Sequence, residues 1–217
     1  MSDIFREVDE EIRRDQLRKL WERYSGLIIA VAVLIVVAVG GWRGYEWWQA
    51  KKAAAAGAAF EAAAQLAEQG KHPEAEAAFA KIAADSTPSY RVLARLREAA
   101  ELAQRDPKAA IAAYQALAAD ISLGQVQQDF AAVRAGQMMV DQSSFDEIKA
   151  LLEPLTTADR PFRHSARALL ALAAWRANDV ATTKRWSDMV LADTETPVST
   201  RGQIEILLML SGEAGKS

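Results

Sequence analysis

One segment of the chain, residues 24–42, limits the folds open to it more than any other feature. These 19 residues lie between Arg23 and Arg43, ten of them are Leu, Ile or Val, and Tyr24 is their only ionisable member. As a helix the segment would extend about 28 Å, close to the ~30 Å hydrocarbon core of a bilayer. Its aliphatic residues favour insertion by roughly 3–6 kcal/mol. We therefore predict a single transmembrane helix over 24–42.

Tryptophan and tyrosine residues lie at both ends of this segment. Six of the ten Trp and Tyr residues of the chain are found there, and such side chains prefer the membrane–water interface. A buried helix of a soluble protein would rarely carry aromatic clusters at both ends. A cleavable signal peptide has a short basic leader and ~7–15 apolar residues, whereas here a 23-residue leader with seven acids comes first. The predicted interface anchors are Trp21, Tyr24, Trp42, Arg43, Tyr45, Trp47 and Trp48.

The basic residues around the segment predict its orientation. Five Lys and Arg residues lie within about 16 residues before it, and three lie shortly after it. Because the more basic flank stays in the cytoplasm, we expect a cytoplasmic N-terminus and an exported C-terminal domain. In a bacterium this is a single-pass protein of the inner (cell) membrane, in contact with the lipid bilayer and with a periplasmic domain.

The segments on either side of the apolar run are predicted to be helical. In the leader, residues 1–23, apolar residues such as Ile4, Val8 and Ile12 recur at helical spacing, which is typical of an amphipathic helix. Such a helix can lie on the membrane surface or against a partner, or it can be a plain juxtamembrane helix without a partner. Residues 43–58 are expected to form a helical connector that leads into the remaining domain, 59–217.

A repeat of about 36 residues runs through this remaining domain. Turn signals recur at that interval, and after each comes a helical segment with a large residue near its middle: Phe79, Tyr114, Leu152 and Trp186. The period is close to the 34 residues of a tetratricopeptide repeat, a helix–turn–helix unit. We expect Phe79, Tyr114, Trp175 and Trp186 to lie in the core between helices. The helices are expected at 53–69, 73–84, 88–104, 107–119, 125–141, 144–155, 161–177, 180–192 and 198–212.

The predicted fold class is therefore all-α. It comprises an N-terminal amphipathic helix, one transmembrane helix, and a tetratricopeptide-like α-solenoid of about four helix pairs with a capping helix. The composition agrees, because Gly and Pro are few, at 11 and 6 residues, while the abundant Ala and Leu favour helices.

The sequence offers little for catalysis, for cofactors or for metals. There is no cysteine, and the two histidines, His72 and His164, stand in no metal-ligand spacing. Phosphate loops, dinucleotide fingerprints and nucleophile elbows are lacking too. A net charge of −3 gives no electrostatic case for nucleic-acid binding. We expect a protein that is not an enzyme and uses no cofactor.

Two basic pairs are the candidates for partner binding. Arg91 with Arg95, and Arg163 with Arg167, are each spaced i,i+4 on the first helix of a predicted repeat. Such first helices line the concave surface of these arrays, where arginines could receive the carboxylates of a peptide. The alternative is a solvated basic face without a partner.

The whole layout resembles a known family, the bacterial YfgM-like proteins. The residues that carry the resemblance are Gly41-Trp42-Arg43 with Tyr45 and Trp48 at the membrane exit, and the leader Asp3–Glu11, which is similar to α-proteobacterial forms. The family consists of ancillary subunits of the Sec translocon. The resemblance implies periplasmic repeats that contact the SecYEG channel and a membrane-anchored periplasmic chaperone of the prolyl-isomerase type. It implies no catalytic residue.

The expected function is thus a non-enzymatic, membrane-anchored adaptor that links the Sec translocon to periplasmic chaperones and assists protein export and folding. Two alternatives remain. The repeats could serve another envelope complex, in cell-wall or outer-membrane assembly, or the domain could be a carboxylate-dependent envelope hydrolase.

Overall fold

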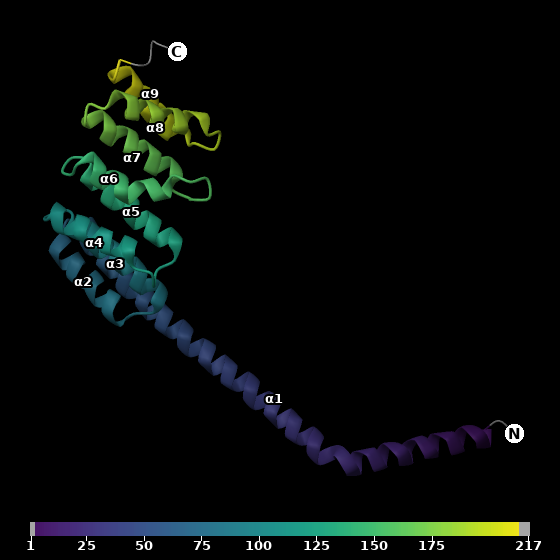
Figure 1. Cartoon of the computed structure of the whole chain (residues 1–217). Helices are drawn as coiled ribbons and strands as arrows, with labels where there is room; N and C mark the ends of the chain where they lie inside the picture. Colours follow the sequence, from purple (N-terminus) through teal and green to yellow (C-terminus); the bar gives the residue numbers. More distant parts are fainter. Residues whose placement is uncertain (1–2, 213–217) are drawn as a thin grey trace. The chain divides into compact units, whose positions relative to one another are not determined.

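The computed structural model describes the backbone of residues 3–212, and the side chains of Arg18 and of residues 21–212. This part of the chain is all-helical and contains no strand, as predicted (Figure 1). Its helices are α1 (Asp3–Glu68), α2 (His72–Asp85), α3 (Pro88–Leu102), α4 (Pro107–Ala119), α5 (Gln125–Met139), α6 (Phe145–Leu152), the short 3-10 helix η1 (Glu153–Leu155), α7 (Arg163–Arg176), α8 (Val180–Ala192) and α9 (Val198–Leu210).

The long helix α1 contains the apolar segment. The chain divides into two compact units, Met1–Ala55 and Ala56–Ser217, and α1 supplies most of the first and the beginning of the second. From Trp21 onward α1 is long and apolar enough to cross a membrane, and none of its most apolar stretch is buried. It is the one such helix among the described residues, and it is compatible with a membrane anchor. The expected amphipathic face of the leader falls almost entirely outside the described side chains.

Local capping chemistry explains where the later helices begin. Pro88 and Pro107 are the first residues of α3 and α4, where the missing N–H costs nothing. The Ser144 side chain accepts a hydrogen bond from the Glu147 N–H, while the Glu147 side chain accepts one from Ser144 N–H, a complete capping box that starts α6. Pro154 cannot continue α6, so the helix expected over 144–155 ends in η1.

Two apolar clusters form the core of the second unit. The smaller one joins the end of α1 to α2 and α3 around Phe79, whose ring meets Phe60 edge-on at 5.2 Å. The larger one runs through α3 to α9 and includes Tyr114 and Trp186. Core positions are therefore confirmed for Phe79, Tyr114 and Trp186. For Trp175 the prediction is wrong: its side chain is 36% exposed.

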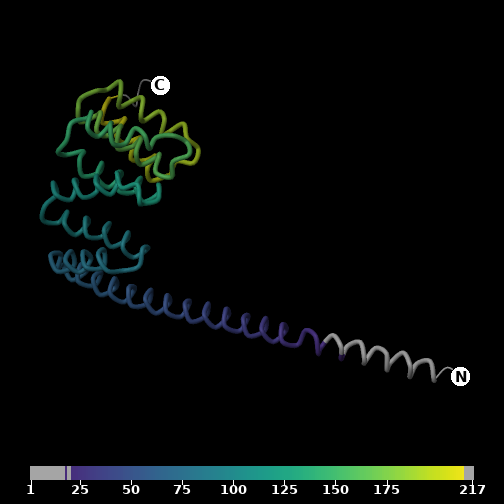
Figure 2. The backbone as a smooth tube through the Cα atoms, turned by 60° about the horizontal axis from the view of Figure 1, so that its bottom comes forward, coloured from purple at the N-terminus to yellow at the C-terminus, as the bar shows by residue number. Residues whose placement is uncertain are grey.

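Each helix of the second unit packs on the next one along the chain (Figures 1 and 2). The closest packing joins α2 to α3, α4 to α5, and α7 to α8. Alanines permit this approach, because small side chains let helix axes come together. A glycine does the same between α5 and α6. At Gly136 of α5 an added Cβ would lie only 2.8 Å from Leu152 Cδ1 of α6. Two of these three close pairs join consecutive predicted repeats, and the third lies within one.

Candidate functional site

An apolar groove between α7 and α9 is the clearest candidate site in the second unit. It encloses about 410 Å³ and also touches α5. Trp175 lies on its wall, which explains why this residue is exposed and not in the core. None of the lining side chains is ionisable; the groove is lined by Gln137, Ser165, Ala168, Leu169, Leu172, Trp175, Thr200, Gln203, Ile204, Ile206, Leu207 and Leu210.

Helix α9 is apolar on both of its faces. Ile204, Leu207 and Leu208 are buried against the rest of the unit. On the outside, Ile206, Met209 and Leu210 are 57%, 62% and 66% exposed. We call these three residues the outer row of α9. Among the described residues nothing covers the outer row, which is therefore an exposed apolar surface.

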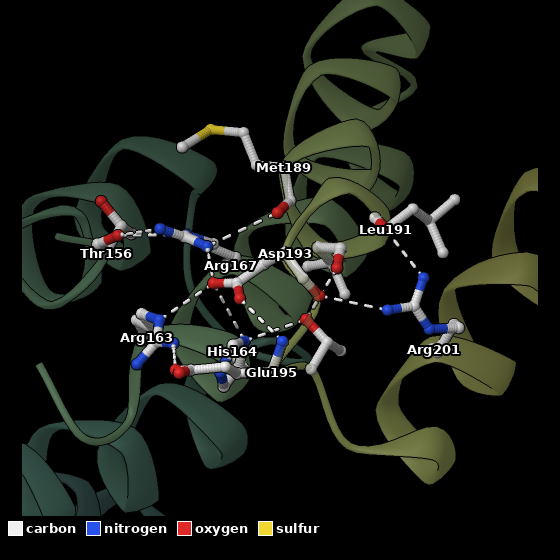
Figure 3. A network of polar contacts seen from close by, with 11 residues as sticks. Thr156, Arg163, His164, Arg167, Met189, Leu191, Asp193, Glu195 and Arg201 are labelled. Carbon is white, nitrogen blue, oxygen red and sulfur yellow. Dashed lines mark hydrogen bonds and ion pairs between the residues drawn. The ribbon is translucent and has the colours of Figure 1, made fainter. Parts of the chain in front are cut away.

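A network of polar contacts centred on Asp193 ties α7, α8 and α9 together (Figure 3). The Asp193 carboxylate, just after α8, accepts hydrogen bonds from Arg163 Nε at 2.9 Å and from Arg167 Nη1 at 3.0 Å. Arg163 also donates to Glu195. In the other direction, Arg201 of α9 donates to the backbone oxygens of Leu191, at 2.7 Å, and of Asp193, at 3.1 Å. The network therefore fixes the two helices that border the groove.

The charge on Arg167 is buried and fully partnered. Its Nε and Nη2 donate to the Thr156 backbone oxygen at 3.0 and 2.7 Å, which adds the segment after η1 to the network. The pKa of the Asp193 carboxyl is held far below its usual range, first by the hydrogen bond from Arg163 and further by Arg167. Burial, with help from the Arg163 charge, lowers the pKa of His164. At neutral pH the Asp193 carboxylate is thus charged between the guanidinium groups of Arg163 and Arg167, and the His164 imidazole beside it is neutral.

The four arginines predicted to bind a partner lie in different environments. Arg163 and Arg167 belong to the Asp193 network, and Arg95 donates to Asp120 at 2.6 Å. Arg91 is exposed and donates only a long hydrogen bond, 3.3 Å, to the Ser86 backbone oxygen. The acidic partners lie 25 to 32 residues further along the chain, so helical spacing could not reveal them. Partner binding by these residues stays a prediction.

Neither histidine lies in a ready metal site. His164, Asp193 and Glu195 bring candidate ligand atoms within 4.8 Å of one another. The carboxylates of Asp193 and Glu195 already accept hydrogen bonds from Arg163 and Arg167, so a cation would have to displace guanidinium groups. His72 pairs with the buried Glu101 carboxylate at 2.7 Å. We interpret both histidines as parts of structural polar contacts.

The aromatic residues predicted as interface anchors are all exposed along α1. C-terminal to the apolar segment, Lys52 Nζ lies 3.7 Å from the centre of the Trp48 ring, and Lys51 Nζ lies 5.3 Å from the centre of the Trp47 ring. Arg43, which follows Trp42, is also exposed and pairs with Glu46 at 3.5 Å. Exposed rings next to cations suit the headgroup region of a bilayer. Their membrane role stays a prediction.

Together these features define a helical-repeat protein that carries a candidate membrane anchor. The chain belongs to the tetratricopeptide repeat-like domain family, whose model matches residues 18–169. The match takes in the apolar segment of α1 and ends within α7, so α8 and α9 lie beyond it. No curated protein and no solved structure matches the chain. The family is typical of protein–protein interaction adaptors and indicates no enzymatic activity.

Proposed function

We propose that the protein is a non-enzymatic adaptor anchored in the bacterial inner membrane. The observation that carries this proposal is a single one: a long apolar helix, none of whose most apolar stretch is buried, lies in the same chain as a tetratricopeptide repeat-like domain. An anchor confines the domain to the membrane surface and raises its concentration near a membrane complex. The repeat family supplies protein-binding surfaces.

The proposed topology has four parts. Residues 1–23 form a cytoplasmic leader, 24–42 span the membrane, 43–58 connect, and 59–217 form a periplasmic repeat domain. The exposed rings of Trp21 and Tyr24 on one side, and of Trp42, Tyr45, Trp47 and Trp48 on the other, would lie at the two interfaces with Arg43. We further propose that the repeats stack as an α-solenoid, because each helix packs on its sequence neighbours.

The proposed partner is the Sec translocon, together with a membrane-anchored periplasmic chaperone of the prolyl-isomerase type. This choice rests on the resemblance of the membrane-exit segment, from Gly41 to Trp48, and of the leader to YfgM-like proteins. In this role the protein would assist the export and folding of periplasmic proteins. An adaptor of cell-wall or outer-membrane assembly would share the same architecture and differ in its partners.

Among the predicted partner-binding residues, Arg91 has the most freedom to contact another protein. Its guanidinium is exposed, whereas Arg95, Arg163 and Arg167 hold internal acidic partners. Arg91→Glu should therefore weaken the binding of an acidic partner without loss of folding. Arg95→Glu, in contrast, also breaks the ion pair with Asp120. Unchanged partner recovery with Arg91→Glu would remove this residue from the binding surface.

The test is a pull-down of the tagged full-length protein from native membranes after brief crosslinking, with partners identified by mass spectrometry. A matched variant keeps only residues 1–58. We expect translocon subunits and a periplasmic chaperone with the full-length protein, and their loss with the short variant. Recovery of cell-wall or outer-membrane factors in their place would overturn the Sec assignment and leave the adaptor class intact. Recovery of the translocon by residues 1–58 alone would place the docking element in the anchor.

A further inference from the structure

We propose that the α7–α9 groove and the outer row of α9 form a symmetric interface with a second copy of this chain. In this arrangement each copy inserts Ile206, Met209 and Leu210 into the groove of the other. The inference concerns assembly and does not depend on the identity of the Sec or other envelope partner.

The first argument is that the outer row and one wall of the groove belong to the same helix, α9. The outer row of α9 is exposed, and α9 also forms one wall of the groove, with Ile206 and Leu210 among the lining residues. A two-fold interface uses the same patch on both subunits and must be self-complementary. The outer row meets this condition because it borders the groove of its own copy. A two-fold axis near α9 then places the outer row of each copy beside the groove of the other.

The chemistry of the groove fits a protein surface better than a small polar ligand. Its floor and walls are Leu, Ile and Ala with Trp175, and its polar members are the neutral side chains of Gln137, Ser165, Thr200 and Gln203. Interface cores are depleted in charged residues and enriched in aromatic residues and Met. The outer row offers Met209 between Ile206 and Leu210, so both halves of the proposed contact have this composition.

Charge supplies the second argument. Arg134 of α5 donates from Nη1 to Gln137 Oε1 at 2.9 Å, which places it beside a lining residue of the groove. Glu205 precedes Ile206 on α9 and is exposed. Within residues 21–212 neither Arg134 nor Glu205 has an ion-pair partner in the same copy. Across the proposed two-fold axis, Arg134 of each copy would pair with Glu205 of the other, so the charges are complementary.

A charge swap tests this pairing in the full-length protein in mild detergent. We expect a dimer by sedimentation equilibrium, and we expect Arg134→Glu or Glu205→Arg alone to weaken its dissociation constant by about tenfold, because each places like charges together. The double variant restores an opposite pair and should return to within about threefold of the original. Arg97→Glu, at an exposed arginine of α3, is the matched control and should leave the dimer unchanged.

Cysteine crosslinking tests the position of the contact, and the absence of native cysteine makes every introduced thiol unique. Ile206→Cys, Met209→Cys and Leu210→Cys are oxidised separately in native membranes, with Lys184→Cys on the exposed surface of α8 as the collision control. We expect a dimer-sized disulfide product from at least one α9 position and none from the control.

Three results would overturn the proposal. They are a monomer at micromolar concentration, a dimer that responds to neither charge reversal nor α9 oxidation, or α9 products with a different protein. A dimer held by α1 alone would give the second result, so the anchor cannot imitate the proposed interface. Each of these results leaves the pull-down that tests the adaptor function unaffected.

Discussion

At the scale of single residues, Arg167 sets the strictest condition on the fold. Its side chain is buried, and a buried cation destabilises a protein by several kcal/mol unless it is paired and hydrogen-bonded. Thr156, Met189 and Asp193 supply the acceptors. The arginine therefore reports on whether the chain after η1, α7 and the end of α8 are correctly assembled.

Removal of this side chain should be costly. We expect Arg167→Ala to lower the free energy of unfolding by about 3 kcal/mol, because it leaves the Thr156 oxygen and the Asp193 carboxylate without their donors. Urea unfolding of the full-length protein followed by far-ultraviolet circular dichroism measures the change. Arg91→Ala is the control, at an exposed arginine, and should stay within about 0.5 kcal/mol of the original. Equal losses for both would contradict a special role for Arg167.

Stability should fall in acid in two stages. Burial lowers the pKa of His164 below its ordinary 6.5, so the unfolded chain takes up this proton first, and stability declines as the pH falls below about 6.5. The hydrogen bond from Ser122, with Arg95, lowers the pKa of Asp120 from 3.8 to about 2. Its contribution is complete above pH ~4 and is lost between pH ~4 and ~2. Urea midpoints across this range should show both stages, and His164→Gln should remove only the first; a pH-independent midpoint from 7 to 4 would contradict the first.

At the scale of helices, local sequence signals predicted most of the fold. Pro88, Pro107 and Ser144 act within one turn of their own helix, so they mark its start without any knowledge of neighbours. The expected helix 198–212 and α9 differ by two residues at one end. What local signals missed is tertiary: Trp175 was expected in the core, but it lies on the wall of the groove between α7 and α9. The partners of Arg163 and Arg167 were also out of reach, since their acids come 26 to 32 residues later.

Two glycine substitutions on helices should have opposite effects. Gly136→Ala places a methyl group against the fully buried Leu152, and we expect a loss of about 1–3 kcal/mol from overpacking between α5 and α6. Gly202→Ala on α9 meets no atom within 4 Å and should gain up to about 1 kcal/mol from helix propensity. Both changes are read from urea midpoints. Stabilisation by Gly136→Ala would show that α5 and α6 are packed less closely than the structure indicates.

At the scale of the whole molecule, the two parts of the chain suit different surroundings. The apolar stretch of α1 is exposed and requires a bilayer or another apolar cover, whereas the second unit has its own core. Hydropathy and aromatic placement predicted the first part, and the 36-residue period predicted the repeat class that the family match bears out. The identity of the partner could not be worked out from residue patterns, because a repeat scaffold presents its binding surface through many exposed side chains and no fixed motif.

The anchor can be tested by charge insertion. We expect Leu34→Arg combined with Val37→Arg to cost roughly 6 kcal/mol of insertion free energy, about as much as the aliphatic residues contribute. The full-length variant should then be released from membranes by alkaline carbonate, while the original resists. Val126→Arg with Val180→Arg, at two exposed positions of the second unit, is the matched control and should stay membrane-bound. Retention of the anchor variant would show that α1 is not what holds the protein.

The position of Asp193 in the chain also bears on the order in which the domain can assemble during synthesis. Ribosomes make Arg163 and Arg167 first, and the carboxylate that neutralises them follows 26 to 30 residues later. Until α8 has emerged, α7 carries two cations without an anion, and its burial is unfavourable. The docking of α7 therefore waits for the end of α8. A released chain that ends just before Asp193 should leave α7 open to protease, and one that extends past Glu195 should protect it.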